Sequence, residues 1–108
     1  MIVNLTPHEL KLHDEGGRLV ATVPPSGQVA RVRTSAVRVG EAAEGVPLFV
    51  TEFGDVEGLP APKPDTIYVV SGLVRSHPQV AAREDVYSPG RLLRDEQGRV
   101  VGAVGLTR

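Results

Sequence analysis

Five charged side chains near the C-terminal end form the densest group of residues that could do chemistry. They are Arg83, Asp85, Arg91, Arg94 and Asp95. Guanidinium groups bind phosphate or carboxylate through paired N–H donors, so this group could hold an anion or a nucleotide. Alternatively, Arg83 or Arg91 pairs with Asp85, and Asp95 accepts hydrogen bonds inside its own turn. We favour the structural interpretation and keep Arg83, Asp85, Arg91 and Arg94 as candidate residues for binding a ligand or partner.

Two histidines near the N-terminus raise the possibility of a metal site. His8 and His13 lie close in sequence to the carboxylates of Glu9 and Asp14. Imidazole and carboxylate groups are common ligands of divalent metals. However, five residues of strand separate the two histidines by about 16 Å. We therefore interpret them as turn or surface residues and predict no metal site.

Ser71 lies where a nucleophile elbow could occur, between a predicted strand and a predicted helix. Such an elbow requires the pattern G-x-S-x-G, whereas Val69 stands at the position of the first glycine. A serine at this place commonly caps the following helix by accepting a hydrogen bond from a backbone N–H group. We predict capping. His77, six positions later, is a conceivable partner of a nucleophile, but Pro78 leaves the direction of its side chain undefined by the sequence.

The pattern of basic residues does not predict a nucleic-acid site. Arg31, Arg33 and Arg38 form a short stripe on one predicted strand, without interleaved aromatic side chains. The formal net charge of the chain is −1, so no overall field attracts nucleic acid or anionic lipid. We expect neither nucleic acid nor a membrane as a partner.

Composition favours a small β-rich protein. The 108 residues suit a single domain spanning 1–108. Valine occurs 18 times and only four residues are aromatic, and β-branched side chains suit pleated sheets. Because cysteine is absent, disulfides, thiolate catalysis and cysteine-type zinc sites are excluded. No signal-peptide pattern or membrane-spanning apolar run is visible, so we expect a soluble, cytoplasmic protein.

The spacing of apolar and turn residues predicts short strands, including two hairpins. The expected strands are 2–5, 9–13, 18–23, 28–39, 46–53, 67–70, 91–94 and 99–106. Ile67–Val70 has no polar alternation, which indicates a central strand covered on both faces. Pro78 limits any helix over 72–83 to two short pieces or a kinked one. We expect Asp85–Gly90 to be irregular, and no internal repeat is apparent.

Four motifs in a fixed order connect the chain to a family. They are NLTPH (Asn4–His8), PKPDTIYVVS (Pro62–Ser71), RxDVxxPG (Arg83–Gly90) and RDxxGxVVG (Arg94–Gly102). Together they resemble a family of small uncharacterised proteins from bacteria and their phages. The resemblance implies a mobile-element or accessory setting and no particular activity, cofactor or catalytic residue.

We therefore expect a mainly β fold: a single small antiparallel β-sandwich or partly open barrel, with one short helix after the Ile67–Val70 strand. The favoured function is a small non-enzymatic binding module. It would engage a protein partner, or a second copy of itself, through an exposed sheet edge or the 83–95 corner. The alternative is a small enzyme or ligand sensor that binds an anionic small molecule through Arg83, Asp85 and Arg91. The favoured hypothesis involves no catalytic residue and no cofactor.

Overall fold

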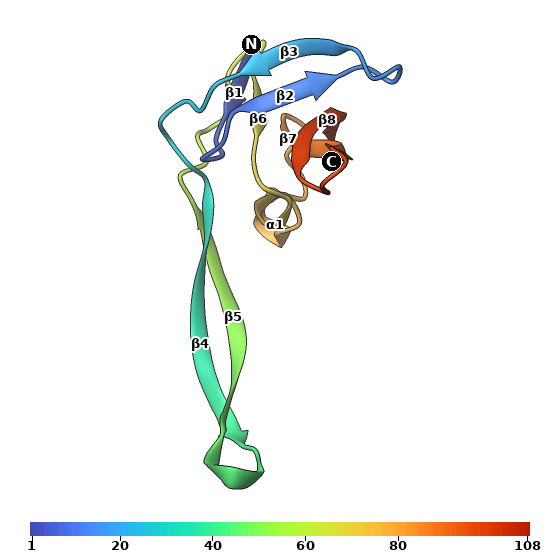
Figure 1. Ribbon diagram of the computed structural model, residues 1–108. Coiled ribbons are helices and arrows are strands. Elements are labelled where there is room, and N and C mark those ends of the chain that lie inside the picture. The colour runs from blue at the N-terminus through green and yellow to red at the C-terminus, as the bar shows by residue number, and fades with distance from the viewer.

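The computed structural model describes residues 1–108 and consists mainly of β-strands, with one short α-helix (Figure 1). The strands are β1 (Ile2–Asn4), β2 (Leu10–His13), β3 (Leu19–Val23), β4 (Arg31–Glu41), β5 (Pro47–Glu57), β6 (Ile67–Val69), β7 (Val86–Arg94) and β8 (Val100–Thr107). The helices are α1 (Gly72–Arg75) and two 3-10 helices, η1 (Ala43–Gly45) and η2 (Pro78–Val80). The predicted mainly β fold is confirmed. The expectation that Asp85–Gly90 is irregular is wrong, because Val86 and Tyr87 pair with β6 and make this segment the first half of β7.

Six strands form one curled sheet in the order β1-β6-β7-β8-β2-β3. The strands at the two ends of this order, β1 and β3, lie near each other, which confirms the predicted partly open barrel (Figure 1). The pairing is mixed rather than antiparallel throughout, since β6 runs parallel to β1 and β7, and β8 runs parallel to β2. The connection between β6 and β7 consists of α1 and η2. These are the two short pieces expected from Pro78.

Asn4 bridges the gap between β1 and β3. Its buried side-chain amide donates from Nδ2 to the carbonyl oxygens of Val23 (3.1 Å) and His8 (2.7 Å). Its Oδ1 accepts from the backbone N–H (2.9 Å) and the hydroxyl (2.7 Å) of Thr6. The backbone N–H of Ser26 donates to the Asn4 carbonyl at 3.0 Å. Every donor of this amide is used, so the NLTPH motif is a structural joint.

Two hairpins of the sheet are copies of one another. Residues 10–23 and 91–104 are offset by 81 positions, share seven of fourteen residues, and both turn through Asp-Glu-x-Gly-Arg. Their strand registers correspond residue for residue, including an irregularity at the same place in each hairpin. In each turn the aspartate carboxylate accepts from the backbone N–H groups two and four residues later. The expectation of no internal repeat is therefore wrong, because the repeat lies in turn residues and register.

The core of the barrel is small for a chain of this length, with 14 of 108 residues buried. The larger cluster consists of Leu5, Ala30, Tyr68, Val70, Val74, Val80 and Val86. A second cluster joins Leu10 and Leu12 of β2 to Val69 of β6. Of the two longest strands, only Val32 and Val56 pack against the larger cluster. The barrel is therefore built without most of β4 and β5.

Replacing Asn4 by alanine should destabilise the barrel by about 2–4 kcal/mol, because it removes the amide that donates to the Val23 and His8 carbonyl oxygens and leaves the buried Thr6 N–H without its acceptor. Urea denaturation of both proteins measures this difference. Gln28→Ala is the matched control, since the exposed Gln28 amide donates to the Gly58 carbonyl at 2.8 Å. This loss should cost less than about 1 kcal/mol. Equal stabilities of the two variants would show that the Asn4 side chain does not stabilise the closure between β1 and β3.

Candidate functional site

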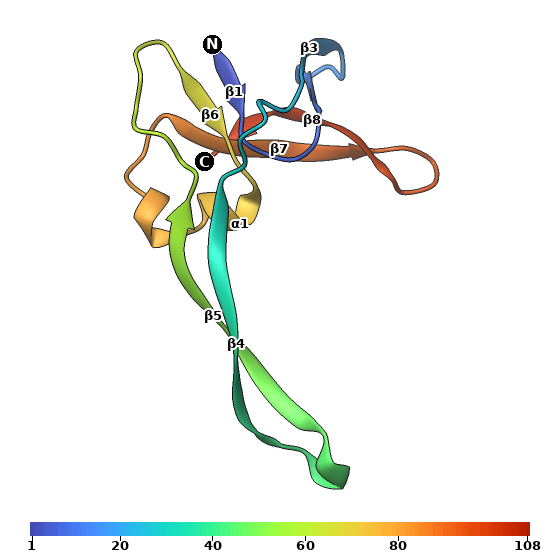
Figure 2. The same ribbon diagram turned by 90° about the vertical axis from the view of Figure 1, so that its left-hand side faces the viewer.

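Strands β4 and β5 form a two-stranded arm that projects from the barrel (Figures 1 and 2). Each strand has 11 residues, which corresponds to a length of about 36 Å. The whole molecule measures 53 × 39 × 23 Å, so the arm dominates its outline. A lone two-stranded hairpin is only marginally stable in water. An arm of this length therefore gains stability when another surface covers it.

Both faces of the arm carry apolar side chains that are about half exposed to solvent. Phe49 and Phe53, the only phenylalanines of the sequence, are 58% and 57% exposed. They stand four positions apart on β5 and therefore share one face, which we call the phenylalanine face. The opposite face carries Val37, Leu48 and Val50, which are 37%, 45% and 46% exposed. Exposed apolar surface of this kind is common at interaction sites of proteins.

The root of the arm is held by hydrogen bonds to η2 and its preceding residue. His77 Nδ1 accepts from the Gln79 N–H at 3.0 Å, so Nε2 carries the ring proton and donates to the Gly54 carbonyl at 2.7 Å. Gln79 Oε1 accepts from the Val56 N–H at 2.8 Å, and its Nε2 donates to Asp55 Oδ1 at 2.7 Å. These bonds attach the arm to the barrel in a defined direction.

The outer part of the arm is acidic. Between Val39 and Glu52 the sequence contains Glu41, Glu44 and Glu52 and no lysine or arginine. Arg38, at the inner boundary of this segment, lies 3.7 Å from Glu41, and both side chains are more than half exposed. An exposed pair of this kind contributes little stability. The outer arm therefore combines apolar faces with negative charge.

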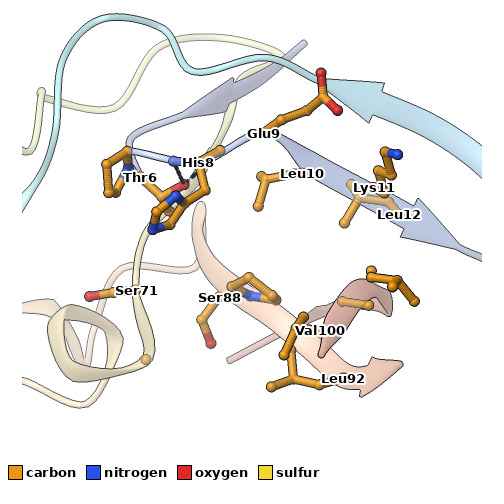
Figure 3. A pocket seen from close by; sticks show the side chains of 16 residues that line it. Thr6, His8, Glu9, Leu10, Lys11, Leu12, Ser71, Ser88, Leu92 and Val100 are labelled. Carbon is orange, nitrogen blue, oxygen red and sulfur yellow. Dashed lines mark hydrogen bonds between the residues drawn. The ribbon is translucent and has the colours of Figure 1, made fainter. Parts of the chain in front are cut away.

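A groove of about 950 Å³ lies between β2 and the β7–β8 hairpin (Figure 3). Leu10 and Leu12 point from β2 towards Leu92 and Val100 on the other side. Lys11 lies beside them on β2. Volumes near 1,000 Å³ are at the upper end of the range for binding pockets, whose linings are mainly apolar. This groove is the largest concave surface of the molecule.

The structure places Ser71 at the N-cap of α1, as predicted. Its hydroxyl oxygen accepts from the backbone N–H of Val74 at 3.3 Å. His77 is turned away from it and bonds to the root of the arm. His8 and Ser71 both border the groove, and no hydrogen bond joins them. The hydroxyl thus serves the helix rather than a nucleophile–base pair.

The two N-terminal histidines lie in different surroundings. His8 borders the groove, whereas His13 ends β2 and packs against β8. The contact with β8 is so close that a Cβ atom on Gly102 would lie 2.4 Å from His13 Cε1. Any larger residue at position 102 would displace the imidazole. No cluster of three metal-ligating side chains occurs in the structure.

The charged candidates do not form one cluster. Arg83 makes a bidentate ion pair with Asp85, through Nε (2.8 Å) and Nη2 (2.9 Å), and Nη2 also donates to the Pro60 carbonyl at 3.0 Å. Arg94 lies at the far end of β7, where Nη1 donates to the Gly98 carbonyl at 2.9 Å. Strand β7 separates the two ends by about 30 Å.

Two further charged candidates lie along the same hairpin. Asp95 accepts from the N–H groups of Gln97 and Arg99 within its own turn. Arg91 lies on β7, is exposed and belongs to no ion pair of the chain. The pairing of Arg83 with Asp85 and the turn around Asp95 thus follow the structural interpretation. The binding role of the candidates stays a prediction, and Arg91 and Arg94 are the two whose charges have no ion pair in the chain.

The ion pair shifts the pKa of both of its members. Hydrogen bonding from the Arg83 guanidinium is the main cause that lowers the pKa of Asp85 below its ordinary value, against an opposing effect of burial. The same hydrogen bond is the main cause that raises the pKa of Arg83. Both side chains are largely buried, with exposures of 22% and 20%. The pair therefore fixes the connection between Pro60 and the start of β7.

Comparison with known proteins gives no match: no protein-family model, no curated protein and no solved structure is similar to this chain. The helices of the structure are all too short to cross a membrane.

The ion pair predicts a defined dependence of stability on pH. Because the pKa of Asp85 is lower in the folded state, its contribution is present above about pH 4, the unfolded value, and is lost as the pH falls through the folded value. Asp85→Asn should cost about 1 kcal/mol at pH 7, and this difference should shrink below pH 4. Urea denaturation at several pH values measures it.

A double-mutant cycle with Arg83→Gln isolates the pair. The double variant should cost little more than Arg83→Gln alone, since Arg83→Gln already removes the ion pair together with the hydrogen bond to the Pro60 carbonyl. A cost of Asp85→Asn that stays constant down to pH 2 would show that the carboxylate charge is not what stabilises this corner.

Proposed function

We propose that this chain is a non-enzymatic binding module that engages another protein chain through its β4–β5 arm. The observation that supports it best is the uncovered phenylalanine face. A phenylalanine presents about 200 Å², so the exposed parts of Phe49 and Phe53 amount to about 230 Å². Covering them would contribute about 6 kcal/mol at 25 cal/mol per Å², before the costs of association.

The dimensions of the arm suit a specific interface. A ribbon about 36 Å long and about 10 Å wide presents roughly 360 Å² on each face, and twice that over both faces. A standard protein interface buries about 800 Å² on each partner. The arm reaches this size when a partner covers both faces, and both faces are apolar.

The fixed root also favours binding. The bonds of His77 and Gln79 to the arm hold its direction before a partner arrives. Less conformational freedom is then lost on association, which leaves more of the burial energy as affinity. The motif resemblance adds a bacterial or phage-related setting to this proposal.

The alternative function, a sensor or enzyme for an anionic small molecule, receives less support. An anion at Arg83 would compete with the Asp85 carboxylate and the Pro60 carbonyl for the same N–H donors. Arg91 lies farther along β7 and is not part of that arrangement. The donors of Arg83 therefore already have partners within the chain, whereas the exposed apolar side chains of the arm do not.

A photo-activated cross-linking residue at position 49 tests the proposal in cells that contain the protein. Its insertion in place of Phe49 should give one discrete covalent adduct on illumination, because that side chain is the one a partner would cover. Mass spectrometry of the adduct measures the added mass and identifies the partner. The matched control carries the same residue in place of Val20, an exposed apolar residue of β3, and should give none. Equal adduct formation at both positions, or none at position 49, would contradict a role for the arm.

A further inference from the structure

We propose that the partner of the arm is a second copy of this chain. The phenylalanine face of one copy enters the groove between β2 and the β7–β8 hairpin of the next. This inference rests on the proposed function and adds the identity of the partner and the surface that receives the arm.

The arm cannot fill the groove of its own chain. It leaves the barrel in a direction away from β2, β7 and β8 in both views (Figures 1 and 2). The hydrogen bonds of His77 and Gln79 at the root oppose a rotation back towards the barrel. Each chain therefore carries an uncovered apolar arm and a separate apolar groove that only different copies can bring together.

The two surfaces match in chemistry. The groove has leucine and valine side chains on both walls, among them Leu12, Leu92 and Val100, and its volume is about 950 Å³ (Figure 3). Aromatic side chains are the most frequent anchors in pockets of this kind. Phe49 and Phe53 are also more exposed than Val37, Leu48 and Val50 on the opposite face, so covering them removes more apolar surface from water.

The two surfaces also match in charge. The outer arm carries the carboxylates of Glu41, Glu44 and Glu52 without a lysine or arginine. Lys11 and Glu9 both line the groove, so their charges offset each other, whereas Arg91 and Arg94 on β7 have no ion pair within the chain. Opposite charges around an apolar centre favour the encounter and fix the register of an interface. The carboxylates of the arm are thus complementary to the two unpaired arginines of β7, the strand that carries Leu92 of the groove.

Such a contact joins two different surfaces, so it is heterologous. Each bound copy still has a free arm at one end and a free groove at the other. Heterologous contacts of this kind produce closed rings or open filaments rather than simple dimers. We therefore expect wild-type protein to form assemblies larger than a dimer as its concentration rises.

Complementary variants test this arrangement by light scattering across about 1–200 µM. The arm variant is Phe49→Thr/Phe53→Thr, which keeps β-branched residues in β5. The groove variant is Leu92→Glu/Val101→Glu, at two half-exposed positions of the groove. Each variant alone should be a monomer, with association weakened at least about 100-fold. An equal mixture should give a 1:1 dimer and nothing larger, because one intact arm then meets one intact groove.

The repeated hairpins supply a matched control. Val20 in β3 corresponds to Val101 in β8 and is also exposed, but it does not line the groove. Val20→Glu should therefore associate like wild type. Circular dichroism establishes that each variant is folded. If the groove variant unfolds, Arg91→Glu replaces it and should weaken association about tenfold at low salt.

Three results would overturn the inference. Monomeric wild type at about 200 µM would exclude a second copy, while cross-linking at position 49 would still report another partner. A folded groove variant, or Arg91→Glu, that associates like wild type would show that arms bind elsewhere. A mixture of folded variants that stays monomeric would show that an intact arm and an intact groove do not bind each other. Absence of the cross-link at position 49 would instead contradict the proposed function, the binding of another chain through the arm.

Discussion

One buried amide determines how this barrel closes. Asn4 joins β1 to the end of β3 and uses its full hydrogen-bonding capacity there. The same joint directs the following chain, because Ser26 bonds to the Asn4 carbonyl and Ala30 bonds to the Leu5 carbonyl at 3.0 Å just before β4 begins. Without a joint at this place the edges of β1 and β3 would be open and the arm would lack a defined starting point.

The arm is then the part of the chain that the closed barrel does not need. Its apolar residues contribute nothing to the core beyond Val32 and Val56, yet both phenylalanines of the sequence are placed on it. A ribbon with two apolar faces is unfavourable in water, and no helix or strand of the same chain lies against its outer half. This imbalance between a small core and a long uncovered arm is what a binding role explains and a self-sufficient monomer does not.

Local features were predictable from the sequence, and long-range ones were not. The hairpins, the Ser71 cap and the break at Pro78 depend on neighbouring residues, and the structure contains all of them. The parallel neighbours of β6, and the early start of β7, depend on pairing across the sheet. The segment Val46–Phe53 has the sequence pattern of a strand whether or not a second layer covers it. The alternation of side chains shows which residues share a face of the strand, but not what packs against that face. The role of His77 was missed for the same reason, since its ring bonds to Gly54, 23 positions away.

The repeated hairpins suggest how a groove arises in so small a fold. At corresponding places the two copies differ: Lys11 in the first copy stands where the second has Leu92. Leu92 makes one wall of the groove apolar, while Lys11 lies with Glu9 on the β2 side of it. Both copies keep the aspartate turn and the strand register, which the sheet requires. The difference therefore falls on the surface where an acidic, aromatic arm would bind and leaves unchanged the contacts that hold the barrel together.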